Sequence, residues 1–236
     1  MKLYSEDSSP FSAPVRVAVY AKGLTIAIEP PPGGLLSAKF HAINPVGTIP
    51  CLILENDTPL PESAAIMEYL EDKFPEEPLR PAGPEAKARV RLLQRIGELQ
   101  IMTPLVELSR QADPAQRDPS ASVWLTRLVR GLSSVQIYIG DDQFAAGAQL
   151  TLADCELAPA LFMLAKIAAA YGKPGLLQAY PPIGRYLASS SRHPAIRRVL
   201  AEMAPAWELR EPAQGRRFLA IIIAFDFAIF CFPPPR

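Results

Sequence analysis

The 236-residue chain has little cysteine and little histidine, with three and two residues respectively. Cys51, Cys155 and Cys231 stand singly in apolar stretches and lack the CxxC spacing of zinc and thiol-exchange sites. Isolated histidines and scattered cysteines form no ligand cluster, so we expect no metal. Cysteines of this kind are typical of reduced core residues, which argues against a disulfide framework and favours a cytoplasmic protein.

An excess of charge of one sign is also missing, because 24 lysines and arginines balance 24 acidic residues. Without a basic run, we expect no nucleic-acid partner. The N-terminus lacks the apolar segment of a secretory signal. One nearly apolar stretch, residues 218–232, is shorter than the roughly 20 residues of a membrane span and contains Asp226, so no transmembrane segment is expected. The role of the tail over residues 213–236 stays open.

The first third of the chain alternates strand and helix signals. Strands are expected over residues 2–5, 25–29, 51–54 and 58–60, and helices over residues 36–43 and 62–74. A further helix begins near Ser12, because Pro14 fits only a first turn, and it stops at Gly23. This order predicts an α/β thioredoxin-like domain (βαβ-α-ββα) with a mixed four-stranded sheet over residues 1–76.

A proline-rich segment follows, with four prolines between residues 75 and 84, and it predicts a linker over residues 77–86. Beyond it the pattern is helical throughout, which predicts an all-α C-terminal helical bundle over residues 87–212. Pro104 is expected to bend the first helix. Thr151 and Asp154 have the spacing of a capping box at the start of the most apolar helix, which belongs at the centre of the bundle. The expected helices lie near residues 84–112, 119–141, 151–171, 177–190 and 194–204.

The segment from Asn44 to Leu54 combines a turn with a proline at the point where a strand should begin. One interpretation is a cis Ile49–Pro50 peptide bond. It would leave the main-chain N–H and C=O of Ile49 free to pair with a peptide-like ligand. The other interpretation is a trans proline at the start of an edge strand.

Glu62 and Ser63 open the helix that follows this hairpin. Free N–H groups at a helix N-terminus can accept a carboxylate, and Glu62 can meet an ammonium group of the same ligand. The alternative is that Glu62 only complements the helix dipole and Ser63 only caps the helix.

The sequence Asn-Pro-x-Gly-x-Ile-Pro-x-Leu, followed by Glu-Ser-x-Ala-Ile, closely resembles the glutathione-binding half of the glutathione S-transferase family. The run from Ser9 to Ser12 resembles the opening of its serine-type members, among them bacterial-like cytosolic enzymes. The resemblance implies a cytoplasmic, homodimeric detoxification enzyme that activates glutathione as a thiolate for attack on a small hydrophobic electrophile. It assigns the thiolate-stabilising hydrogen bond to Ser9, and glutathione binding to Phe11, Thr48, Ile49, Pro50, Glu62 and Ser63.

Several of these assignments have alternatives. Ser12 and Tyr4 could replace Ser9 as the group that stabilises the thiolate. Thr48 stands where relatives often carry Lys or Gln, so the anchor for the glycine carboxylate of glutathione stays open, with Lys39 and His41 as weak candidates. No cysteine precedes the first helix, which argues against thiol–disulfide exchange.

Two other functions stay open beside the transferase. A glutathione-dependent isomerase, lyase or etherase would have the same fold. Pro10, Phe11 and Pro14 replace the second serine, the cysteine and the arginine of the zeta-class motif, which argues against a zeta-type isomerase. A non-catalytic binding or scaffold protein of this fold would not bind glutathione. The electrophile and the class within the family also stay open.

Overall fold

The structure, a computed structural model, describes residues 1–113, 115 and 117–207. The apolar stretch over residues 218–232 lies outside these residues. Within them, no helix combines the length and the apolar character that crossing a membrane requires.

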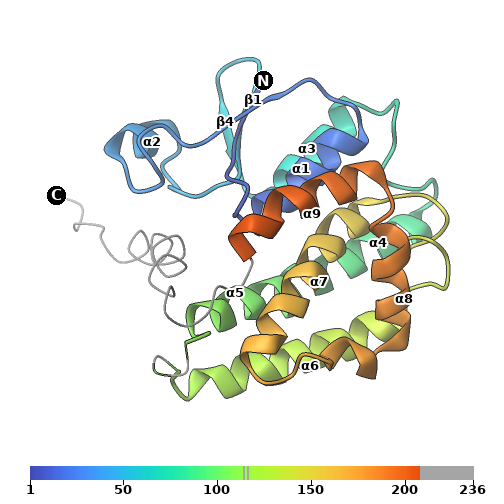
Figure 1. Cartoon of the computed structure of the whole chain (residues 1–236). Coiled ribbons are helices and arrows are strands. Elements are labelled where there is room, and N and C mark those ends of the chain that lie inside the picture. The colour runs from blue at the N-terminus through green and yellow to red at the C-terminus, as the bar shows by residue number, and fades with distance from the viewer. Residues whose placement is uncertain (114, 116, 208–236) are drawn as a thin grey trace.

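Four short strands form one mixed sheet, as expected: β1 (Lys2–Tyr4), β2 (Ala27–Glu29), β3 (Cys51–Ile53) and β4 (Pro59–Pro61). They lie in the order β2-β1-β3-β4 (Figure 1). β1 pairs parallel with β2 and antiparallel with β3, and β4 pairs antiparallel with β3. The parallel pair needs a crossover connection, which helix α1 (Ser12–Ala21) supplies. This helix begins where the sequence predicts.

Helices cover both faces of the sheet. Side chains alternate between the two faces along each strand, so consecutive strand residues contact different helices. Leu3 belongs to the main hydrophobic core, together with apolar residues of α1 and α3 (Ser63–Lys73). Tyr4, the next residue, lies in a smaller core with Phe40 of α2 (Ala38–Ile43). The N-terminal part of the chain is therefore a three-layer α/β unit, and this confirms the thioredoxin-like expectation.

The C-terminal part of the described chain is all helical, which confirms the predicted bundle (Figure 1). The helices are α4 (Pro84–Ile96), the π-helical turn η1 (Gly97–Met102), α5 (Thr103–Arg110), α6 (Ser120–Tyr138), α7 (Leu152–Ala170), the 3₁₀ turn η3 (Leu176–Ala179), α8 (Pro181–Ser190) and α9 (Pro194–Trp207).

Several helix boundaries differ from the expected ones, two of them at prolines, and α6 ends at Tyr138 instead of residue 141. The helix expected over residues 84–112 contains η1 just before Pro104, because proline has no N–H for the carbonyl four residues earlier. The helix expected over residues 177–190 is divided, since Pro181 starts α8 after η3. α9 continues past residue 204 to Trp207.

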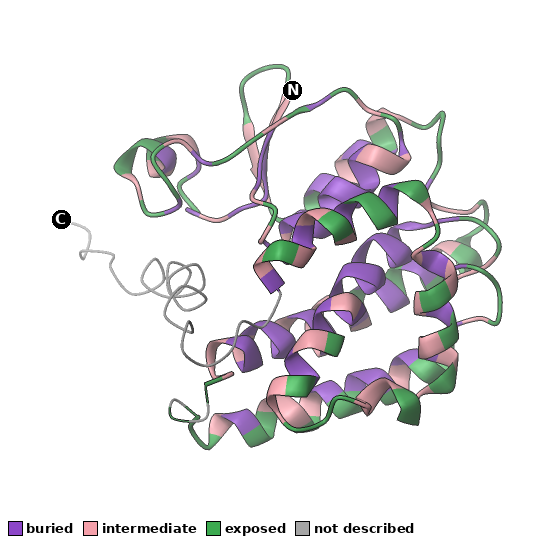
Figure 2. Ribbon diagram, in the orientation of Figure 1, coloured by how far each residue is buried: buried purple, intermediate pink, exposed green. Residues whose placement is uncertain are grey.

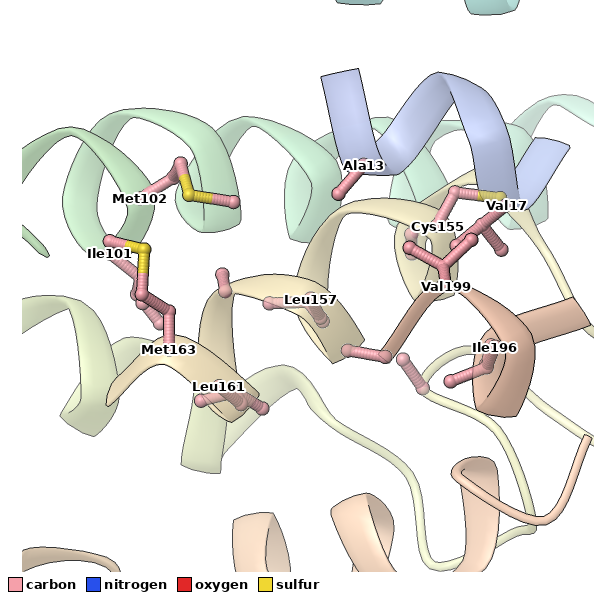
Figure 3. Close-up of a cluster of buried hydrophobic side chains, with 14 of the residues drawn as sticks. Ala13, Val17, Ile101, Met102, Cys155, Leu157, Leu161, Met163, Ile196 and Val199 are labelled. Carbon is pink, nitrogen blue, oxygen red and sulfur yellow. The ribbon is translucent and has the colours of Figure 1, made fainter. Parts of the chain in front are cut away.

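α7 lies at the centre of the bundle, and its residues 152–161 are all buried (Figure 2). The predicted capping box is present at its start. Asp154 Oδ2 accepts the Thr151 N–H at 2.8 Å, and Asp154 Oδ1 accepts the Ala145 N–H at 2.8 Å. Figure 3 shows Cys155 of α7 beside Val17 of α1 and side chains of α9. The main core is therefore continuous from the α/β part into the bundle.

A buried ion pair fastens the proline-rich linker to the α/β part. Lys22 Nζ lies 2.7 Å from Glu71 Oε2, and the two side chains are 1% and 5% exposed. The Glu71 carboxylate also accepts the main-chain N–H groups of Leu79 and Arg80, each at about 3.0 Å. Lys22 Nζ donates in addition to the Phe74 carbonyl at 2.9 Å. Both charges are thus desolvated and hydrogen-bonded, the condition under which a buried pair is tolerated.

Glu156 of α7 is another buried carboxyl group, and it packs against η1. A Cβ at Gly97 would lie 2.9 Å from Glu156 Cγ, so glycine is required for this close approach. The pKa of Glu156 is raised to about 8, chiefly by burial and in addition by the nearby Glu98 carboxylate, against the lowering effect of Arg95.

This pKa predicts a pH-dependent contribution to stability. The folded-state pKa lies above the unfolded-state value of about 4.3, so the folded protein binds the proton more tightly. The free energy of unfolding should therefore fall as pH rises from about 5 to about 8. Glu156→Gln, which cannot ionise, should flatten this decline in urea unfolding, whereas Glu85→Gln in the exposed first turn of α4 should not. An unchanged pH profile in Glu156→Gln would contradict the assignment.

Candidate functional site

The strand register brings three separate segments to one edge of the sheet. Tyr4, the last residue of β1, pairs with Cys51, the first residue of β3, and Cys51 also pairs with Pro61, the last residue of β4. The loop after β1, the segment before β3 and the start of α3 therefore meet at the same edge. These segments carry all the site residues predicted from the sequence, namely Ser9, Phe11, Thr48, Ile49, Pro50, Glu62 and Ser63.

Ser9 lies in the loop between β1 and α1 and is 3% exposed. Its Oγ accepts a hydrogen bond from the Ser12 N–H at 3.2 Å, so Ser9 closes the turn that leads into the helix. A serine hydroxyl also has one hydrogen to donate. Among the described residues nothing accepts that hydrogen. The capping role of Ser9 is therefore compatible with donation to a ligand beside the helix N-terminus.

The alternatives to Ser9 lie in different surroundings. Ser12 is fully buried, and its Oγ has no hydrogen-bond partner among the described residues. Tyr4 packs edge-on against Phe40 with ring centroids 5.6 Å apart, on the face of the sheet opposite α1. Phe11, at the N-cap position of α1, is half-buried against the main core.

The Ile49–Pro50 peptide bond is cis, which confirms one of the two interpretations of this segment. The Ile49 side chain is buried in the smaller core. None of the described residues hydrogen-bonds to the main-chain N–H or C=O of Ile49. Ile49 thus keeps one donor and one acceptor, the pair that an extended peptide uses when it adds to a strand.

Asn44 shapes the turn before Ile49 that the sequence predicts, and it does so through side-chain hydrogen bonds. Its side-chain amide donates to the Thr48 carbonyl at 2.9 Å, and its side-chain oxygen accepts the Val46 N–H at 3.1 Å. Gly47 has a φ of 74°, and a Cβ there would lie 2.3 Å from Cε1 of His41. The Asn-Pro-x-Gly sequence is therefore the signal for this turn, since glycine alone fits the conformation and the space.

Glu62 precedes α3 in a left-handed conformation, with φ 71° and ψ 116°, that residues other than glycine rarely adopt. Such conformations cost of the order of 1–3 kcal/mol and cluster at ligand-binding sites. Among the described residues no side chain caps α3, so the N–H groups of its first turn remain available to an anion. Ser63, the first residue of α3, is 8% exposed, and the Glu62 side chain is exposed.

Cys51 follows Pro50 directly, yet it is not a reactive thiol. Burial raises the pKa of Cys51 to about 11, so the group stays protonated at neutral pH. Because the thiolate is the nucleophile in disulfide exchange, this cysteine is inert.

Two contacts that hold the Ser9 loop have no signal in the sequence. The Trp207 indole N–H donates to the Ser8 carbonyl at 3.1 Å, and the fully buried Arg16 pairs with Glu202 at 2.6 Å. These partners are 199 and 186 positions apart. They meet only in the folded chain, so no local pattern reveals them.

Comparison with family models gives two matches. Residues 3–78 match the glutathione S-transferase N-terminal domain, and residues 84–189 match the glutathione S-transferase C-terminal domain. Together the two models cover most of the chain and meet across the proline-rich linker.

Individual proteins are similar over most of the chain. A maleylacetoacetate isomerase of Pseudomonas aeruginosa is 30% identical over 207 residues, 84% of this chain and 94% of the relative. A stringent starvation protein A homolog of Coxiella burnetii is 31% identical over 164 residues, 70% of this chain and 76% of the relative. Among solved structures, the holo form of a maleyl pyruvate isomerase, described as a bacterial zeta-class glutathione S-transferase, has a TM-score of 0.70. It is 27% identical, and the match covers 87% of this chain and 99% of that one. The chain belongs to the glutathione S-transferase family.

Proposed function

We propose that this protein is a glutathione transferase that binds glutathione at the sheet edge beside Ser9 and activates its thiol. The observation that carries the proposal is the meeting, at one edge, of three groups that no described residue pairs with. They are the hydroxyl hydrogen of Ser9, the main-chain N–H and C=O of Ile49, and the uncapped N-terminus of α3. Family membership supports glutathione as the ligand that joins them.

Each part of glutathione has a partner of suitable chemistry in this proposal. The cysteinyl main chain pairs with Ile49 as an added strand. The γ-glutamyl carboxylate binds Ser63 and the N–H groups of α3, and Glu62 meets the ammonium group. Pro50 fixes the turn, while Phe11 and Thr48 line the two ends of the ligand. The energy of the left-handed conformation at Glu62 is consistent with a site built for binding.

Ser9 lowers the pKa of the bound thiol by donating its hydroxyl hydrogen to the sulfur. Lowering a thiol pKa from about 8.5 by roughly two units requires about 3 kcal/mol. One hydrogen bond to a charged group supplies about 1.5–3 kcal/mol, and a helix N-terminus adds about 0.3–1 kcal/mol. The thiolate then forms a bond to the electrophilic carbon, and the leaving group departs with its electron pair. We further propose, from the family resemblance alone, a cytoplasmic homodimer.

Isomerase activity is a second candidate, favoured by the 30% identity to a maleylacetoacetate isomerase along 84% of this chain. An isomerase would use the same thiolate but release glutathione unchanged, and a lyase or etherase would cleave a bond of its substrate with it. Pro10, Phe11 and Pro14 weigh against the zeta-type reaction, because they replace polar residues of that motif. The similarity to a stringent starvation protein A homolog, a name that states no reaction, keeps a non-catalytic role as a third candidate.

A substrate panel distinguishes these candidates. Purified protein is first tested for retention on glutathione resin, and then incubated with glutathione and either a chlorinated aromatic or a maleyl-type substrate. A transferase forms the aromatic conjugate and consumes one glutathione per product. An isomerase converts the maleyl substrate without net loss of glutathione. Retention without either reaction would contradict the transferase, and absence of retention would leave only the scaffold role.

A further inference from the structure

Every main-chain carbonyl of the Ser9 loop, from residue 6 to residue 9, accepts a hydrogen bond. The Glu6 carbonyl accepts the Ser9 N–H at 3.0 Å, and the Ser9 carbonyl accepts the Ala13 N–H at 3.2 Å. These two bonds are local to the turn. The Asp7 and Ser8 carbonyls between them accept bonds from side chains outside the turn, which therefore help to determine the path of the loop.

The donor to Ser8 comes from the last described helix of the bundle. Trp207 ends α9, and its indole Nε1–H donates to the Ser8 carbonyl at 3.1 Å. Trp207 is 3% exposed and Ser8 is half-buried, so the donor end of the bond is shielded from water. It acts on the residue directly before Ser9.

The donor to Asp7 is Arg16, a fully buried residue of α1. Its Nη2 donates to the Asp7 carbonyl at 2.9 Å, and its Nη1 lies 2.8 Å from Asp7 Oδ1 and 2.6 Å from Glu202 Oε2. Glu202 belongs to α9 and also accepts the Tyr20 hydroxyl at 3.0 Å. A buried guanidinium group needs acceptors for its N–H groups, and Glu202 is one of them. Glu202 therefore orients the Arg16 guanidinium group, which donates to the Asp7 carbonyl through its other nitrogen.

α9 thus reaches the Ser9 loop at two successive residues. It packs against α1 and α7, with Val199 and Ile196 in the main core (Figures 1 and 3). A helix anchored in the bundle is a rigid support for this loop.

We infer that Trp207 and Glu202 are positioning residues for Ser9: through the Ser8 and Asp7 carbonyls they aim its hydroxyl at the ligand sulfur. This inference rests on the proposed function. Hydrogen bonds weaken steeply with misalignment, and a displacement of about 0.5 Å in a supporting loop is enough to spoil a site. The helical domain would in this way contribute to thiol activation without touching glutathione.

Trp207→Phe tests the inference, because it removes the indole N–H and keeps an aromatic ring. Trp124→Phe is the matched control, since Trp124 is the only other tryptophan and lies on α6. The pKa of bound glutathione is measured from its thiolate absorbance in titrations of the full chain. We expect an increase of about one unit in Trp207→Phe, or about tenfold less thiolate below that pKa, with glutathione affinity changed less than about threefold. The control should match wild type.

Hydrogen exchange of the main-chain amides provides a readout that does not need glutathione. Exchange at Ser9, Ser12 and Ala13 should become faster in Trp207→Phe and stay unchanged in Trp124→Phe, while α7 stays protected in both. Faster exchange throughout α7 would mean only lower global stability and would overturn the positioning role. An unchanged thiol pKa together with unchanged loop exchange would also overturn it.

Glu202→Gln is the second variant, and it decides the outcome if Trp207→Phe does not fold. Loss of its charge should shift the thiol pKa and the loop exchange in the same direction. If the wild-type protein does not shift the thiol pKa of glutathione, the proposed function fails. Hydrogen exchange of the loop amides then still tests whether α9 holds the loop. Wild-type exchange at the loop in both variants then overturns the inference.

Discussion

Ser9→Ala is expected to raise the pKa of bound glutathione by about two units and to lower kcat for thiol transfer about 10²–10³-fold. The reason is that the Ser9 hydroxyl hydrogen is the donor proposed to stabilise the sulfur anion, and alanine supplies none. Glutathione affinity should change little, because the remainder of the tripeptide is proposed to bind at Ile49 and the start of α3. The thiolate absorbance of the bound ligand as a function of pH, and turnover with the substrate identified in the panel, measure the two effects.

Two neighbouring serines provide the controls for this substitution. Ser8→Ala leaves the Ser8 carbonyl that accepts the Trp207 indole N–H and should behave as wild type. Ser12→Ala removes the buried hydroxyl that has no partner in the described part of the chain, the first alternative to Ser9. A large effect in Ser12→Ala with none in Ser9→Ala would transfer the role to Ser12. If neither substitution changes the thiol pKa, Tyr4 becomes the candidate for stabilising the thiolate.

Glu71→Ala should lower the free energy of unfolding by about 3–5 kcal/mol. The substitution leaves the Lys22 ammonium group buried without its carboxylate, with a side chain only 1% exposed. It also removes the acceptor of the Leu79 and Arg80 N–H groups, which lie in the linker between the two parts of the chain. Urea unfolding followed by circular dichroism measures the effect, and this prediction does not depend on the proposed function.

Glu55→Ala is the matched control for this ion pair. Glu55 pairs with Lys73 at 2.7 Å on the surface, with side chains 64% and 29% exposed, so water and salt screen the interaction. Its unfolding midpoint should stay close to that of wild type. A Glu71→Ala midpoint equally close to wild type would mean that the Lys22–Glu71 pair does not hold the linker.

Local sequence patterns were sufficient to predict the fold. The alternation of strand and helix signals in the first 61 residues predicts the four strands. Helix α1 has Pro14 in its first turn and ends before Gly23, as expected. The capping box at Thr151 was also predicted, and the cis bond before Pro50 was one of two interpretations, because each depends on a few adjacent residues. Pro104 predicts an interruption of the first bundle helix, but it does not predict that the interruption is the π-helical turn η1.

The residues of the candidate site could be named from the sequence, but their support could not. Ser9, Ile49 and Glu62 stand in short motifs, and the strand register then brings those motifs to one edge. Trp207 and Glu202 stand in no motif, because their contacts with Ser8 and Arg16 join opposite ends of the chain. Such contacts follow from the packing of α9 on α1, which is a property of the whole fold.

The position of bound glutathione in a crystal of the complex tests the central claim most directly. The account predicts that the cysteinyl N–H and C=O pair with the main chain of Ile49, and that the sulfur lies within about 3.5 Å of Ser9 Oγ. A tripeptide bound elsewhere, or a sulfur whose only hydrogen-bond donor is Ser12 or Tyr4, would contradict it.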